Sequence, residues 1–486
     1  MKNNKTLIFI KNLHPLEIKK FKKFATSPYF NSNRKLFKLS EYLCKEYPFK
    51  REISVKAETM FNYVYGNIKF NRQMLHNLFT ALNKLFIDFI IQLQLENDEF
   101  NRHLFLTKQF RSRKYFKETI NNINSGLKQI DTSNTNVTDR LNRRFLLLTE
   151  QAELFLLTAE HNKFIDNEVI RAEVIAYKMI LEMIEIAGNI FAYEKFFPSN
   201  EKKLMFKAIW DSLDFNRLIK QAGKLDQNDA ILLEMSLLEY LILYGENKSE
   251  NYYKLEKLVK ENLNRFNFND KFKIWDIMTK SIDFSLSYYD KSFKKKSHVL
   301  NIYFIENGAY VSEDENNVND NNIRSIFSCA IIENDWKWAE QFVEKYHNYL
   351  SPELRDNTYN YLIGQCRMQE KNFGKALSHF SKVKLKDIII NLDVRVLILK
   401  CHFELNHWEE LISSIDSFKH FLVNQEIPGY LDRDYKTFFR LLAKIIQYKI
   451  NKHKIDVSSI KEAQERNTFI EKKWIIQKLK DLVYNN

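Results

Sequence analysis

A repeat of about 35 residues organises the sequence between residues 323 and 425. Three cysteines each precede an aromatic residue by seven positions, and these pairs are Cys329 with Trp336, Cys366 with Phe373, and Cys401 with Trp408. Each aromatic residue follows a polar pair, namely Asn334-Asp335, Lys371-Asn372 or Asn406-His407. A period of this length with helical patterning is typical of stacked helical hairpins, one hairpin in each repeat. The sequence therefore predicts paired helices in this region.

The scarcity of glycine and proline extends this prediction to the whole chain. The 486 residues include nine Gly and six Pro, against roughly 7% and 5% in ordinary proteins. Sheets with tight hairpins need these residues at their turns, so their absence favours helices. We therefore predict an all-α fold, with an N-terminal helical domain followed by an array of α-α hairpins.

Four segments are expected along the chain. They are a basic helical domain over 1–130, a hairpin array with long helices over 139–311, the repeats over 323–425, and a C-terminal helical cap over 430–486. The polar stretch from Asp131 to Asp139 is the expected linker, and the acidic run from Ser312 to Asn322 is an expected exposed loop.

The second repeat carries the clearest family pattern. It reads Tyr361-Leu362-Ile363-Gly364, then Asn372-Phe373, Ala376, Phe380 and Val383. This pattern resembles the tetratricopeptide repeat, although Arg367 stands where that family has an inner aromatic residue. The resemblance implies a solenoid in which the first helix of each hairpin lines a concave, peptide-holding surface. The residues expected there are Arg324, Ser328, Tyr361, Gln365 and Lys400.

The N-terminal segment carries a second resemblance. The stretch from Leu13 through Ser27-Pro28-Tyr29-Phe30-Asn31 to Tyr42 is similar to a set of uncharacterised bacterial proteins of about this length. This resemblance implies no function.

Positive charge is concentrated at the N-terminal end of the chain. Residues 1–150 hold 27 Lys and Arg against 13 Asp and Glu, whereas residues 151–486 hold 48 against 49. An asymmetry of this kind indicates contact with nucleic acid or another acidic surface.

The helix expected from Leu16 to Ala25 is the most basic element of this region. Its lysines lie opposite its apolar face, and the expected basic patch consists of Lys19, Lys20, Lys22, Lys23, Arg111 and Arg113. Such a patch could bind phosphates of nucleic acid, lie on an anionic membrane, or only face solvent. A helix-turn-helix formed by the helices expected at about 55–65 and 72–96 is a further alternative, with Arg72 and Gln73 at the start of the second of them.

Catalytic and metal-binding motifs were not found in the sequence. The cysteines lack the close pairing of metal sites, and the acidic loop from Asp314 lacks the Gly and Glu of an EF-hand. Glycine-rich phosphate loops and the common hydrolase motifs are missing. We therefore expect no enzyme activity, metal or cofactor.

No apolar run resembles a secretory signal or a transmembrane helix, and unpaired cysteines suit the cytoplasm.

Two functions are consistent with these patterns. The first is a non-catalytic scaffold or adaptor that binds a protein or peptide through its repeats. The alternative is a regulator whose basic N-terminal domain binds nucleic acid while its repeats sense a partner.

Overall fold

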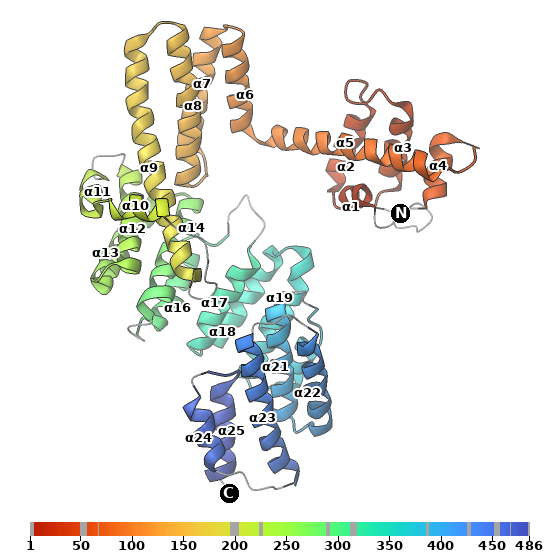
Figure 1. Cartoon of the computed structure of the whole chain (residues 1–486), viewed down its shortest axis with the longest axis vertical. Helices are drawn as coiled ribbons and strands as arrows, with labels where there is room; N and C mark the ends of the chain where they lie inside the picture. The colour runs from red at the N-terminus through yellow and green to blue at the C-terminus, as the bar shows by residue number, and fades with distance from the viewer. Residues whose placement is uncertain are drawn as a thin grey trace. The chain divides into compact units, whose positions relative to one another are not determined.

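All regular elements of the described chain are helices. The structure is a computed structural model that describes residues 4–48, 56–66, 68–194, 204–222, 227–287, 292–311, 318–384, 388–424, 429–451, 457–466 and 468–484. Within these ranges the helices follow one another with short breaks and no strand occurs (Figure 1). The predicted all-α class is confirmed.

The chain divides into two compact units, residues 1–183 and 184–486. The helices of the first unit are α1 (Lys5–Lys11), α2 (Pro15–Thr26), α3 (Arg34–Glu46), α4 (Ala57–Tyr65), α5 (Arg72–Asn97), α6 (Glu99–Ser112), α7 (Phe116–Thr132), α8 (Val137–Leu157) and α9 (His161–Glu194). The boundary between the units falls inside α9.

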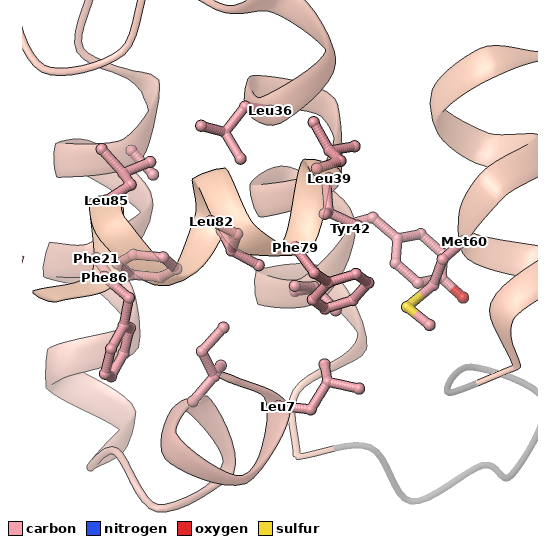
Figure 2. Close-up of a cluster of buried hydrophobic side chains, with 14 of the residues drawn as sticks. Leu7, Phe21, Leu36, Leu39, Tyr42, Met60, Phe79, Leu82, Leu85 and Phe86 are labelled. Carbon is pink, nitrogen blue, oxygen red and sulfur yellow. The ribbon is translucent and has the colours of Figure 1, made fainter. Parts of the chain in front are cut away.

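One apolar cluster holds α1 to α5 together. Side chains from these helices converge on α5 (Figure 2), where Phe21 of α2, Leu39 of α3 and Leu82 of α5 are fully buried. Burying each such side chain contributes roughly 1.5–3 kcal/mol. Because the apolar positions of α2 and α5 recur every three or four residues, each helix presents one continuous stripe to this core.

Helix α5 is also the one element of the described chain with the length and composition to cross a membrane. A core helix can meet the same criteria, and this is weak evidence for a membrane span. Its buried stripe, which includes Leu75, Phe79 and Phe86, packs in the N-terminal cluster.

The expected linker from Asp131 to Asp139 forms a short break between two packed helices. Helix α7 ends at Thr132 and α8 begins at Val137, and the two lie side by side. Arg144 of α8 forms an ion pair with Asp131 of α7. The four domain boundaries expected from the sequence stay predictions.

The second unit continues with α10 (Leu204–Asp211), α11 (Phe215–Ala222), α12 (Gln227–Tyr244), α13 (Lys248–Asn262), the 3-10 turn η2 (Leu263–Arg265), α14 (Phe268–Lys280), the π-helix η3 (Ser281–Leu286), α16 (Ser292–Glu306), α17 (Asp320–Ile332), α18 (Trp336–Tyr346), η4 (His347–Tyr349), α19 (Pro352–Gln369), α20 (Phe373–Phe380), α21 (Ile388–Glu404), α22 (Trp408–Val423), α23 (Gly429–Asn451), α24 (Val457–Glu465) and α25 (Lys472–Tyr484). Consecutive helices pack in pairs. Residues 312–317 of the expected acidic loop, including Asp314, lie outside the described residues.

The three predicted hairpins are closed by one common turn. Asn334, Lys371 and Asn406 are left-handed, with φ of 61°, 60° and 59°. In each turn the next residue donates its backbone N–H to the carbonyl five positions earlier, and the N···O distances are 2.9 Å in all three. This bond is the longer one of a Schellman motif. The polar pairs of the sequence repeat therefore mark equivalent turns.

The same turn recurs outside the predicted repeats. It closes α6 onto α7 at Lys114 and separates α8 from α9 at Ala159, where φ is 63° and 57°. Gly308 adopts it after α16, with φ of 73°. The i to i−5 backbone bonds at these three sites measure 2.9 to 3.0 Å. Helical hairpins of this kind thus extend into the first unit.

The repeat cysteines occupy the packed interior of the hairpins. Cys366 and Cys401 are fully buried and Cys329 is half-buried, and all are free thiols. Burial is the predominant cause that raises the pKa of each to about 12. A buried, protonated thiol behaves as a small apolar side chain.

Candidate interaction surfaces

Polar contacts connect the first helices of the three repeats along one side. The hydroxyl of Thr358 on α19 donates to the carboxylate of Asp320 on α17. On the next pair of helices, the hydroxyl of Tyr361 donates to Asp393 Oδ2 of α21 at 2.5 Å. We call the side of α17, α19 and α21 that carries these contacts the first-helix face.

Tyr361 is at the centre of this face. Gln365 lies one turn further along α19, and the charge of Arg324 acts on the Tyr361 hydroxyl. Burial, together with the nearby Asp393 carboxylate, raises the pKa of Tyr361, which stays protonated and donates. Burial likewise raises the pKa of Asp393. Of the residues expected to line the groove, Tyr361 therefore bonds the buried Asp393 carboxyl group, and the charge of Lys400 acts on the same group.

The Lys400 side chain on α21 forms an ion pair with a residue far along the chain. It is 14% exposed and its Nζ lies 3.0 Å from a carboxylate oxygen of Glu471, just before α25. One turn further along α21, Glu404 accepts from Trp474 Nε1 at 3.0 Å and from Lys478 Nζ at 2.8 Å. Residues 471–478 therefore already cover the part of the first-helix face that belongs to α21.

The part of the face on α17 is open. Arg324 is held by Asp320, with 3.0 Å between its guanidinium nitrogen and a carboxylate oxygen. Ser328 is exposed, and its hydroxyl donates to the carbonyl of Arg324 at 2.8 Å. Four positions further on, Ile332 is 71% exposed. Because residues four apart share one side of a helix, these three residues form a continuous surface.

The lysines of the expected basic patch lie on α2. Lys19, Lys20, Lys22 and Lys23 are all exposed. Lys20 forms an ion pair with Glu96 of α5 at 2.9 Å. For Lys19, Lys22 and Lys23, no carboxylate within the described residues lies at ion-pair distance. The free positive charge of α2 is thus on these three side chains.

The two arginines of the expected patch lie on α6 and have different surroundings. Arg111 pairs with Glu150 of α8 at 2.9 Å and approaches Glu153 at 3.7 Å. Its guanidinium therefore serves the packing of α6 on α8, because it balances the buried carboxylate of Glu150. Arg113 is the C-cap of α6 and donates to Gln109 one turn earlier.

The exposed ring of Tyr29 was missed as a candidate from the sequence. It lies three residues after the end of α2 and is 88% exposed. The only sequence indication was its position in the Ser27–Asn31 stretch that carries the N-terminal resemblance. Periodicity does not detect it, because Tyr29 belongs to no helix.

A pocket of about 870 Å³ lies where α5 meets α6 and α7. Its lining includes Glu96, Arg102 and His103. The ring of His103 contacts the amide of Asn122 at 3.0 Å, and that amide also donates to the carbonyl of His103 at 2.8 Å. This histidine is therefore tied into the packing of α6 against α7.

The second unit contains a buried carboxyl group. Glu239 of α12 is 3% exposed, and its Oε1 has no hydrogen-bond partner among the described residues. Burial raises the pKa of Glu239 to about 8, against the opposing effect of Lys280, whose Nζ is 2.6 Å from Asp276. Burial therefore favours the protonated form of Glu239.

Comparison of this chain with protein-family models, with curated proteins and with solved structures found no match in any of the three.

Proposed function

We propose that this chain is a non-catalytic, tetratricopeptide-like helical-repeat protein that binds a segment of another protein on the open part of its first-helix face. The supporting observation is the pair of polar links, Asp320 with Thr358 and Tyr361 with Asp393, that hold successive first helices side by side. They fix the backbone on which exposed side chains are presented.

The composition of the open face favours a protein partner. It offers the exposed hydroxyl of Ser328 beside the apolar side chain of Ile332. Protein interfaces combine apolar contacts with about one hydrogen bond per 100–200 Å², and this surface provides both. Since the network behind it is internally bonded, little side-chain ordering is needed when a partner binds.

The location of this surface can be tested by site-specific photo-crosslinking in the native host. A photoreactive residue at Ser328 or Ile332 should give a covalent adduct with the same protein. The matched control is Ser378, an exposed serine on α20, which is the second helix of its hairpin. Equal adducts from Ser328 and Ser378, or none from Ser328 and Ile332, would contradict the proposal.

A pair of isoleucine variants gives an independent test on the identified partner. Ile332→Asp introduces a charge into the proposed contact and should weaken binding by about tenfold or more, because an unpaired charge is then desolvated. Ile412→Asp changes an isoleucine that is 45% exposed on α22, a second helix. Its effect on binding should be less than twofold. Equal losses in both variants would place the contact elsewhere.

A further inference from the structure

The ring of Tyr29 is presented on a tightly bonded turn. The carbonyl of Ser27 accepts the backbone N–H groups of Phe30 and Asn31 at 3.2 and 2.9 Å. The buried side chain of Asn31 donates through Nδ2 to the carbonyl of Ala25 at 2.8 Å. These bonds fix the backbone on both sides of Tyr29, so the Cα atom that carries its ring has a defined position.

Aromatic packing between this turn and α2 supports the position of the Tyr29 ring. Phe30 stacks on Phe24 of α2, with 4.0 Å between ring centroids. Tyr29 meets Phe30 edge to face at 4.9 Å. Among the described residues, Tyr29 therefore has one aromatic neighbour, and 88% of its surface is open to solvent. Such a ring offers a preformed surface for stacking.

The unpaired lysines of α2 lie close to this turn along the chain. Lys19, Lys22 and Lys23 are at positions i, i+3 and i+4 and share one side of the helix. At 1.5 Å per residue, Lys19 and Lys23 are about 6 Å apart along the helix axis. Successive phosphates of one stacked strand rise about 3.4 Å each, so the row spans about two nucleotides.

The surroundings of α2 distinguish among anionic partners. Insertion into a membrane would need the apolar side of the helix, but Ile18, Phe21 and Phe24 are buried in the N-terminal core. A duplex keeps its bases stacked inside, where an exposed ring cannot reach their faces. An unpaired base can stack on an aromatic ring while its phosphates meet lysines.

We propose that the lysine side of α2 and the turn at Tyr29 form a binding site for single-stranded nucleic acid. Lys19, Lys22 and Lys23 contact phosphates, and the ring of Tyr29 stacks on one base. This site goes beyond the binding of protein by the repeats and does not depend on it.

The test uses fluorescence anisotropy of the full chain with labelled oligothymidylate and oligouridylate, over a range of salt concentrations. Tyr29→Ala should weaken binding about tenfold, the usual effect of removing a stacked aromatic ring. Tyr29→Phe keeps the ring and should bind as the wild type does. Preference for one of the two probes identifies DNA or RNA as the source of the strand.

The lysines are tested through the salt dependence. Replacing Lys19, Lys22 and Lys23 together by Gln should reduce the slope of log affinity against log salt by about 2, since each phosphate contact contributes about 0.7. The matched control replaces Lys254, Lys257 and Lys260 on α13. These residues have the same charge, but each lies within 4 Å of a glutamate oxygen, and their loss should leave the slope nearly unchanged.

Four results would overturn the proposal. They are no binding of either probe by the wild type, unchanged affinity in Tyr29→Ala, an equal loss of slope in the α13 control, and tighter binding of a duplex or of phosphatidylserine vesicles than of the single strands. Circular dichroism of each variant verifies that the helices remain.

Discussion

Gly364 on α19 lies directly against the ring of Phe380 on α20. A Cβ atom built on Gly364 would be 2.5 Å from Phe380 Cε1 and 2.8 Å from its Cδ1. Phe380 is itself 1% exposed, so its ring has little room to move. The glycine of the second repeat is therefore required by close packing of the two helices.

Gly364→Ala should destabilise the protein by about 1–2 kcal/mol. Overpacking a tight core costs roughly 1–3 kcal/mol, whereas Ala in place of Gly within a helix returns up to about 1 kcal/mol. The measurement is the free energy of unfolding from urea denaturation. Gly374→Ala on α20 is the matched control, since nothing lies within 4 Å of its Cβ position. It should stabilise by about 0.5–1 kcal/mol, and a shift of the same sign in both variants would contradict the packing argument.

Lys371→Gly should stabilise the second repeat by about 0.5–1 kcal/mol. Lys371 has a φ of 60°, and an ordinary side chain in this conformation costs roughly 1–2 kcal/mol, which glycine avoids. Glycine also gives the unfolded chain more conformational freedom, and this cancels part of the gain. Asn334→Gly changes a residue with nearly the same φ, but asparagine tolerates this conformation. Its gain should be smaller in thermal unfolding, and a larger gain at Asn334 would refute this explanation.

Glu239→Gln should raise the stability more at high pH than at low pH. The pKa of Glu239 is raised from 4.5 to about 8 by burial. Such a group contributes its full stability below the unfolded pKa and loses it as pH rises through the folded pKa. The wild type therefore loses stability between about pH 4.5 and 8, and glutamine does not titrate. From pH 5 to pH 9, the advantage of Glu239→Gln over the wild type in unfolding free energy should grow by a few kcal/mol. The reason is that each unit of difference between the folded and unfolded pKa corresponds to about 1.4 kcal/mol. Parallel pH profiles of the two proteins would rule this out.

The cysteines should react slowly with thiol reagents in the folded protein. Burial raises the pKa of Cys44 to about 11 and that of the three repeat cysteines to about 12. Since only the thiolate attacks, roughly one thiol in a thousand or fewer is reactive at pH 8. Labelling followed by mass spectrometry should show slow native modification and rapid modification in urea. Rapid native labelling of Cys366 or Cys401 would disprove their buried state.

The sequence was sufficient for the all-α class and for the turns of the three repeats. At Asn334, Lys371 and Asn406, a polar left-handed residue precedes an aromatic helix start by two positions, and this local pattern is visible in the chain. The identical turn at Ala159 carries no such mark, because alanine gives no indication of a left-handed backbone. The hairpin array expected from residue 139 onward was therefore predicted without this turn.

The candidate surfaces were only partly predictable, because they depend on contacts between distant residues. The place of Tyr361 on a first helix followed from the resemblance to the tetratricopeptide repeat. Its hydrogen bond to Asp393, which lies in the next repeat, did not. The pairing of Lys400 with Glu471 joins residues 71 positions apart, which no local pattern encodes. Likewise, the charge of Arg111 was visible in the sequence, but its neutralisation by Glu150 was not.

The recurring left-handed turn has the same backbone geometry whatever the length of the helices that it joins. Helices flanking it range from 8 residues in α20 to 34 in α9, yet the backbone bonds that close it keep almost the same lengths. Insertions or deletions inside a helix can therefore change how far a hairpin reaches without altering how the chain reverses. A protein built this way can lengthen one binding surface by mutation while the neighbouring hairpins keep their connections.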